Sequence, residues 1–300
     1  MITLGSSITK GSGSLRRSLC HSCAAIMLGP GWRQINLVLP ERNEVQHGNL
    51  HALFEEIFLK VDNLKKQKAL RCFFFMRKPP GIRLRFALRA PQEDTAREIE
   101  ACVMKLVKRK FVTRFYRSVY EPETFKFGGP EAVAAVHAHF FADSTAWWRW
   151  EQLRYAAATN IDSKLLSVCV LNDLFAQCLD GPEEVWDVWC RIATLHGASV
   201  VSDGPATPPI RIEHLIDEVT RNEQIILRNY RTHNRAIARK LAAISSNGKL
   251  IFGKRLVLPQ IAIYHWNRYG FTPDDRTSMF TAMLRSWSPH VLTVAASGKT

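Results

Sequence analysis

Arg83 and Arg85, in the segment IRLRF, are the first residues of this sequence whose spacing points to chemistry. Apolar and basic residues alternate here as in a strand, so both guanidinium groups are expected on one face of a sheet, about 7 Å apart. Two guanidinium groups that face the same way can bind a carboxylate. The pattern also permits a sheet face that is simply exposed to solvent.

A second group of chemically capable residues lies in YEPETFKFGGP, which begins at Tyr120. Glu123 and Lys126 stand among aromatic residues, and a glycine pair follows them. Glycine permits backbone angles that other residues resist, and Pro130 is well placed as a first helical residue. The segment is therefore either part of a site or an ordinary connection between a strand and a helix.

The third group is YHWNR, which begins at Tyr264. His265 and Arg268 are three residues apart and would share one face of a helix. Histidine can take or give a proton near neutral pH, and a neighbouring cation lowers its pKa. A catalytic histidine and a histidine packed in the core both fit this pattern.

The elements that must position these residues alternate in the first half of the chain. The hydrophobic periodicity predicts strands over 32–39, 70–77, 82–88 and 111–120, and helices over 49–63 and 92–110. The order β-α-β-β-α-β is that of a ferredoxin-like unit, an antiparallel sheet with two helices on one face. The second half predicts helices over 130–142, 144–158, 162–178, 183–195, 212–244 and 256–269, with a loop at 202–209. The predicted fold class is thus α+β, a ferredoxin-like module over 32–129 followed by a mostly helical module over 130–300, with residues 1–31 as a disordered tail.

Charge is distributed unevenly along the chain, whose net charge is +14. Residues 64–117 contain sixteen basic and four acidic side chains, a local net charge of +12, whereas residues 118–213 contain six and thirteen, a net charge of −7. A basic module of this kind predicts an anionic partner, such as an acidic peptide, a small carboxylate or a nucleic acid. No apolar run approaches the roughly 20 residues of a membrane-spanning helix. The seven cysteines, with one CxxC at Cys20 and Cys23, are expected to be reduced thiols of a cytoplasmic protein.

Four segments together resemble one known family, the C-terminal glutamate-elimination domain of lantibiotic dehydratases, in its stand-alone form, the thiopeptide-type bacteriocin biosynthesis family. The matching strings are FFFMRKPPGIRLRF at 73–86, VYEPETFKFGGPEAV at 119–133, FFADST at 140–145 and HWNRYG at 265–270. The resemblance extends over about residues 32–287 and implies that both modules form one elimination domain. It also implies a lyase of ribosomal-peptide antibiotic biosynthesis that expels glutamate from glutamylated Ser or Thr of a precursor peptide, leaving dehydroalanine or dehydrobutyrine.

The resemblance also implies partners and site residues. A separate glutamyl-tRNA-dependent protein would glutamylate the precursor peptide, so direct tRNA binding is not expected, and neither a cofactor nor a metal is implied. The implied catalytic residues are Arg83, Arg85, His265, Glu123 and Lys126, and the residues expected to contact or steer the substrate are Arg268, Asn267, Arg77 and Lys78. Lys126 stands where many relatives have Arg, and lysine binds a carboxylate as a point charge rather than through two parallel N–H groups. The Lys78-Pro79-Pro80-Gly81 turn is typical of the stand-alone members.

Elimination places two demands on a site, a base for the α-proton and stabilisation of the developing negative charge. Glutamate leaves as a carboxylate with an ordinary pKa near about 4, so charge stabilisation matters more than acid assistance. Arg83 and Arg85 are therefore predicted to hold the glutamyl carboxylate, and His265 to act as general acid/base with Arg268 and Glu123 orienting groups around it. Two alternatives remain open: a [4+2] cyclase that forms the pyridine of thiopeptides, and a non-catalytic peptide-binding subunit of a dehydratase complex.

Overall fold

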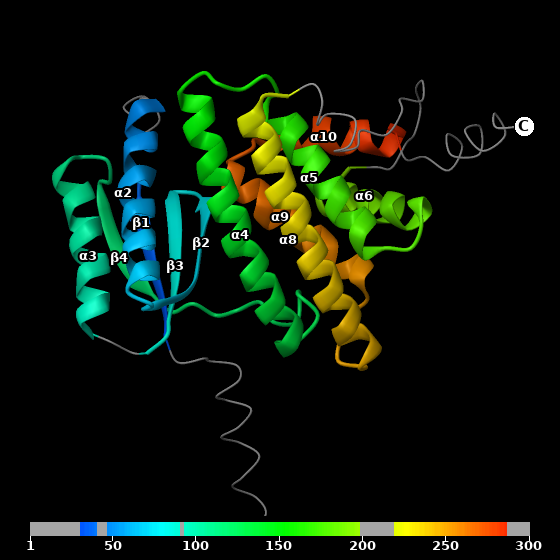
Figure 1. Ribbon diagram of the computed structural model, residues 1–300, viewed down its shortest axis with the longest axis horizontal. Helices are drawn as coiled ribbons and strands as arrows, with labels where there is room; N and C mark the ends of the chain where they lie inside the picture. The colour runs from blue at the N-terminus through cyan, green and yellow to red at the C-terminus, as the bar shows by residue number, and fades with distance from the viewer. Residues whose placement is uncertain (1–30, 41–46, 91–92, 199–218, 287–300) are drawn as a thin grey trace, which may run out of the picture.

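The computed structural model describes residues 31–40, 47–90, 93–198 and 219–286 (Figure 1). Its N-terminal part contains one four-stranded antiparallel sheet in the order β2-β3-β1-β4. The strands are β1 (Trp32–Val38), β2 (Leu70–Lys78), β3 (Gly81–Leu88) and β4 (Arg114–Ser118). Helix α2 (His47–Lys66) follows β1, and α3 (Glu93–Lys108) follows β3. Both the element order and the antiparallel sheet agree with the predicted ferredoxin-like unit.

One face of the sheet is apolar because every second strand residue is a large hydrophobic one. Phe73, Phe75, Leu84 and Phe86 are buried in a single cluster with residues of α2 and α3. Phe54 of α2 stands 4.6 Å from Phe75, measured between ring centroids. Figure 1 shows α2 and α3 together on this side of the sheet. The period-two pattern therefore decides which residues remain for the opposite face.

The opposite face is shared between the helical half and a polar strip. Along β2 it packs on α4 (Pro130–Tyr155), which lies beside this edge strand in Figure 1. Phe74 stacks on His137 of α4 with 5.5 Å between ring centroids, and the Cys72 thiol donates to the His137 carbonyl over 3.2 Å. Toward β1 and β4 the same face carries Gln34, Asn36 and other polar side chains, which form the site described below.

The second half is helical, as predicted. After α4 come α5 (Ser163–Cys178), α6 (Pro182–Leu195), α8 (Arg221–Ser246), α9 (Lys254–Tyr269) and α10 (Pro273–Ser286). The side chain of Asp162 caps α5 by accepting from the Leu165 N–H over 2.7 Å. Thr220 and Glu223 form a capping box at the start of α8.

Two helix predictions need correction. The expected break between 130–142 and 144–158 does not exist, because α4 runs through it. Asp143 is buried and paired inside the protein rather than acting as a cap, and the Ser144 hydroxyl bonds back to the Phe140 carbonyl over 2.7 Å. Helix α10 was not predicted, although Thr272 and Asp275 cap it reciprocally. The predicted tail, the CxxC motif, the loop at 202–209 and the start of the helix expected at 212–244 lie outside the described residues.

None of the helices in the described ranges combines the length and the apolar character that crossing a membrane would require.

Candidate functional site

A row of hydrogen-bonded polar side chains crosses the sheet face opposite α2 and α3. Gln34 and Asn36 of β1 both donate to the Ser118 hydroxyl of β4, over 2.6 and 2.7 Å. On the other side of β1, Arg85 of β3 donates from Nε to Gln34 Oε1 over 2.7 Å. The sequence analysis gave Gln34 and Asn36 no role, although the alternation of residues in WRQIN indicates that both side chains lie on the same face of the strand.

Arg85 is the most enclosed member of this row, with 7% of its surface exposed. Its guanidinium carbon stands 4.3 Å from the ring centroid of Tyr120 and 5.2 Å from that of Phe74. Nη1 also contacts the Met76 sulfur at 3.4 Å. Burial lowers the pKa of Arg85. Within the ranges that the structure describes, no carboxylate forms an ion pair with Arg85. Its buried cation instead contacts aromatic rings, the Gln34 amide oxygen, the Met76 thioether and the Tyr264 hydroxyl.

Arg83 lies on the same face of β3, as the strand alternation predicts. It is opposite Asn36 in the β1 register, just as Arg85 is opposite Gln34. Unlike Arg85, Arg83 is only partly buried and reaches the surface next to Tyr116 and Lys78. The pair therefore consists of one enclosed and one accessible guanidinium group.

The loop after β4 brings a carboxylate to this face. Glu123 and Lys126 form an ion pair with 2.9 Å between Oε2 and Nζ. The hydroxyl of Tyr264, on α9, interacts with the side chains of both Glu123 and Arg85, and burial raises the Tyr264 pKa to about 12. Tyr264 thus links Glu123 to Arg85. The sequence reasoning named its segment but gave Tyr264 no role.

The glycine pair allows this loop to pack closely against the turn between α8 and α9. Gly128 and Gly129 have φ of +84° and +108°, which other residues rarely adopt. A Cβ atom at Gly128 would stand 2.6 Å from Leu250, and one at Gly129 would stand 2.8 Å from Ile251. The Ile251 N–H donates to the Gly128 carbonyl over 2.9 Å. The positive φ angles therefore favour glycine at both positions, and a larger residue would also displace the Leu250 or Ile251 side chain.

Tyr120 and His137 close the site beneath Arg85. The Tyr120 hydroxyl and His137 Nε2 are 2.7 Å apart. Burial, with a smaller contribution from Arg85, lowers the pKa of His137 to about 3, so the ring is neutral at neutral pH. Burial also raises the pKa of Tyr120. Tyr120 and His137 are therefore uncharged where they contact the Arg85 side of the site.

The structure places His265 and Arg268 elsewhere, in a buried network around Asp143 of α4. His265 is 1% exposed and Arg268 is fully buried. Arg268 donates from Nε and Nη2 to Asp143 Oδ2 over 2.8 and 2.5 Å. His265 Nδ1 lies 2.9 Å from Asp143 Oδ1. Burial alone would raise the pKa of Asp143, but Arg268 and then His265 outweigh it and hold that pKa well below its usual range.

The hydrogen bonds around His265 fix its tautomer. Trp266 donates from Nε1 to the Ser167 hydroxyl over 3.1 Å, and this hydroxyl lies 3.1 Å from His265 Nε2. Because the Asp143 carboxylate can only accept, Nδ1 carries a proton, and Nε2 is hydrogen-bonded to the Ser167 hydroxyl. Both ring nitrogens of His265 are consequently engaged inside the protein, and neither faces Arg83 or Arg85. Asp143 lies in the FFADST segment, but the sequence reasoning gave it no role.

Of the remaining residues predicted to contact substrate, Lys78 lies at the surface beside Arg83, whereas Arg77 and Asn267 make contacts elsewhere. Arg77 lies on the opposite sheet face, with its guanidinium carbon 4.8 Å from the Trp147 ring centroid. Asn267 accepts from Arg276 Nη2 over 3.0 Å, and Lys78 is exposed at the hairpin turn. Among the described residues, no cluster of three or more His, Cys, Asp or Glu side chains is arranged to hold a metal ion.

Comparisons with known proteins agree with this architecture. No curated protein matches the sequence. A solved structure, tRNA dependent lantibiotic dehydratase MibB from Microbispora sp. 107891, matches with a TM-score of 0.65 and 14% identity, and it shares the fold over 98% of this chain. This chain spans only 29% of the length of MibB. A second structure, TsrL, matches with a TM-score of 0.48 and 12% identity over 89% of this chain and 97% of that one. The model of the family described as "Lantibiotic biosynthesis dehydratase C-term" matches residues 32–286, and the chain therefore belongs to this family.

Proposed function

We propose that this chain eliminates glutamate from glutamylated Ser or Thr residues of a precursor peptide, leaving dehydroalanine or dehydrobutyrine. Membership of the dehydratase family supports an enzyme of peptide dehydration. MibB is described as tRNA dependent, and this chain corresponds to less than a third of it. The proposal includes a separate glutamyl-tRNA-dependent protein that attaches the glutamyl group before this chain acts, as the resemblance to the stand-alone family implies.

The observation that carries the proposal is the buried charge of Arg85, which has no carboxylate partner among the described residues. A buried charge is costly unless an opposite charge or strong hydrogen bonds compensate for it. Stacking on Tyr120 and Phe74 provides part of that compensation. A glutamyl carboxylate that enters beside Arg83 and Arg85 would provide the rest, and it would gain strength from the dry surroundings.

The proposed step is a β-elimination whose atoms balance without a cofactor. A base removes the proton from the α-carbon of the glutamylated residue. The electrons of that C–H bond form the double bond to the β-carbon, and the bond between the β-carbon and the ester oxygen breaks. Glutamate leaves with the electron pair of that bond as a carboxylate, and the proton stays on the base.

Elimination needs a base for the α-proton and stabilisation of the developing negative charge, and the residues around Arg85 can provide both. Arg83 and Arg85 hold the glutamyl carboxylate and stabilise negative charge on oxygen. Tyr264 keeps its proton because burial raises its pKa to about 12, so it can donate a hydrogen bond to the developing enolate. Glu123 interacts with Tyr264 and is partly exposed, which makes it our candidate for the base, and Lys126 positions it through their ion pair.

This proposal changes the role of His265. The residue was predicted as the general acid/base, but both of its ring nitrogens are bound to Asp143 and Ser167 inside the protein. We propose instead that His265 positions the site, because its network holds α9, and Tyr264 precedes it in that helix. Arg268 acts in the same network and does not touch the substrate.

Two synthetic peptides test the proposal with the purified full chain. One carries an O-glutamyl-serine, and the other carries two preformed dehydroalanines and no glutamyl group. The expected result is that the first peptide loses glutamate, detected by mass spectrometry, while the second is unchanged. An unchanged first peptide would contradict elimination, and conversion of the second to a pyridine would favour cycloaddition instead.

A further inference from the structure

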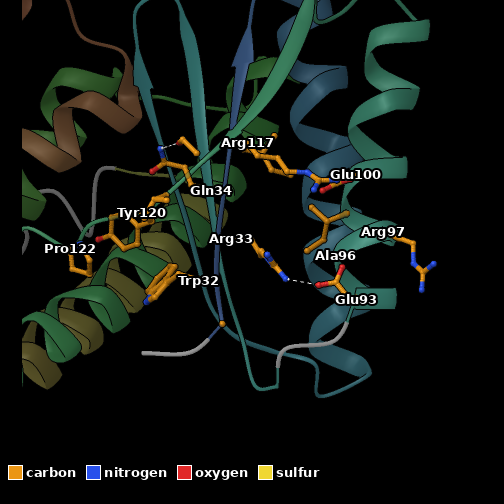
Figure 2. Close-up of a pocket in the computed structure, with 15 residues that line it drawn as sticks. Trp32, Arg33, Gln34, Glu93, Ala96, Arg97, Glu100, Arg117, Tyr120 and Pro122 are labelled. Atoms are coloured by element: carbon orange, nitrogen blue, oxygen red, sulfur yellow. Dashed lines mark hydrogen bonds and ion pairs between the residues drawn. The ribbon is translucent and has the colours of Figure 1, made fainter. Parts of the chain in front are cut away.

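A cavity of about 340 Å³ opens at the sheet edge where β4 separates from β1. In the register of the sheet, β4 pairs with Gln34–Val38 and ends at Ser118, so among the described residues Trp32 and Arg33 have a strand partner only in β3. Figure 2 shows Trp32 and Tyr120 on one side of β1 and Arg33 with residues of α3 on the other. The cavity therefore wraps around a strand edge that β4 leaves uncovered.

The main chain of this edge is oriented for pairing. The Gly31 carbonyl accepts from the Leu88 N–H over 2.8 Å, so Gly31 faces β3. Successive residues of a strand turn their N–H and C=O groups to opposite edges. The Trp32 groups therefore face away from β3, toward the cavity. At the other end of β1, Val38 faces the same edge, since its carbonyl accepts from Thr113 over 2.9 Å.

The cavity has an apolar part to its lining, and the charges at its rim are in ion pairs. Its lining includes Ile35, Ala96 and Ile99, which are buried, and Val119, which is 75% exposed at the mouth. The charged residues at the rim are already paired with one another: Arg33 with Glu93 at 3.0 Å, Arg117 with Glu100 at 2.5 Å and Arg97 with Asp94 at 2.7 Å. Ion pairs of this kind weaken the attraction of the rim to an acidic side chain. An apolar side chain is the ligand that such a lining favours.

The cavity shares a wall with the Arg85 site. Gln34 lines the cavity and also accepts the hydrogen bond from Arg85 Nε. Tyr120 lines it too, and the same ring stacks on the Arg85 guanidinium group. An extended peptide advances about 3.3 Å per residue. A peptide whose reacting residue lies at Arg85 would therefore bring a residue one or two positions away to the cavity.

We propose that this cavity binds an apolar side chain of the substrate peptide, one or two positions from the residue that reacts, while the peptide main chain pairs with the free edge of Trp32. The inference rests on the proposed function for the identity of the peptide as the substrate. Recognition of the peptide would then have two components. Main-chain pairing accepts any extended sequence, and the cavity selects an apolar side chain within it.

Two variants alter the cavity without touching the Arg85 site. Val119→Asp places a charge at its mouth, and the exposure of Val119 leaves folding unaffected. Ala96→Trp fills the cavity from α3. Met104→Asp is the matched control, because Met104 is an apolar residue of the same helix, 50% exposed, that does not line the cavity.

The probes are short synthetic peptides with one central serine and either Leu or Asp at the two positions on each side of it. Fluorescence anisotropy measures their affinity for the full chain without a glutamyl group, and the glutamylated forms then measure elimination. The Leu peptide should bind the natural protein and Met104→Asp about tenfold tighter than the Asp peptide, or more. Val119→Asp and Ala96→Trp should bring this ratio close to one.

Equal affinity of the natural protein for both peptides would overturn the inference, as would an unchanged ratio in both cavity variants. Failure of the proposed function gives a different result. In that case, no glutamylated peptide would release glutamate, while the preference for Leu in the affinity measurement would remain.

Discussion

Replacing Asp143 with Asn should destabilise the protein strongly, because Asp143 is the only carboxylate that the described residues place on Arg268. The substitution keeps the shape of the side chain and removes its charge. Arg268 would then remain fully buried as a cation that has lost its two hydrogen bonds to a carboxylate oxygen. Tyr230, which donates to Asp143 Oδ1 over 2.9 Å, and His265 would compete for the single amide oxygen.

The expected loss in the free energy of unfolding comes from the Arg268 cation, which is left without a carboxylate partner. Removing one partner of a buried ion pair typically costs about 3–5 kcal/mol, since the other charge stays buried without compensation. The double variant Asp143→Asn with Arg268→Met removes both charges and should recover a large part of that loss. Asp94→Asn is the control, because its ion pair with Arg97 is at the surface and such pairs contribute about 1 kcal/mol or less.

Urea unfolding at neutral pH, followed by tryptophan fluorescence and by circular dichroism, measures these differences. The Asp143→Asn protein should unfold at a much lower urea concentration than the natural protein and Asp94→Asn. A loss below about 1 kcal/mol, similar to that of Asp94→Asn, would show that the network around Asp143 does not hold α4 and α9 together as described. Failure of the Arg268→Met substitution to recover stability would refute the proposed origin of the cost.

Three further predictions concern the site, acid stability and salt. Glu123→Gln should lower kcat for glutamate release about 100-fold or more if Glu123 is the base, whereas the neighbouring Glu121→Gln should have little effect, and equal rates for both would exclude this role. Burial lowers the pKa of His137 to about 3 and that of His139 to about 4. Below about pH 6.5 the unfolded chain therefore binds more protons at these histidines than the folded chain does. The free energy of unfolding should consequently fall by roughly 2 kcal/mol per histidine between pH 7 and pH 5. The measurement is urea unfolding at both pH values, and a His139→Leu variant with an unchanged pH dependence would contradict the assignment. Raising NaCl to about 0.5 M should weaken the binding of an acidic peptide more than that of a neutral one, as measured by anisotropy, and equal effects would argue against electrostatic attraction by the basic module.

The sequence predicted the sheet well because each strand has a simple period. Alternation in IRLRF places Arg83 and Arg85 on one face, and the register confirms it. The difference in burial between the enclosed Arg85 and the accessible Arg83 could not be predicted. It depends on Gln34, Tyr120 and Phe74, which approach Arg85 from β1, from the loop after β4 and from β2, and no local pattern states how these segments meet.

The helical spacing of His265 and Arg268 predicted correctly that they share a face, since both bind Asp143. It could not say whether that face looks into the core or into a site. The deciding residue, Asp143, lies 122 positions before His265, at the one position between two helices that were predicted as separate. A buried ionised network is specified by such distant pairs, and Tyr264, one residue before His265, is the one that reaches Arg85.

In the proposed mechanism, Arg85 binds the carboxylate of the glutamyl group that leaves. The most direct test of this claim is the rate of glutamate release from a peptide with one O-glutamyl-serine, compared between the natural protein, Arg85→Gln and Arg109→Gln, a surface control that removes an exposed ion pair with Glu56. The rate of glutamate release by Arg85→Gln should be at least about 100-fold lower than that of the natural protein. The rate of Arg109→Gln should be close to the natural rate. Equal rates for Arg85→Gln and the natural protein would contradict the claim.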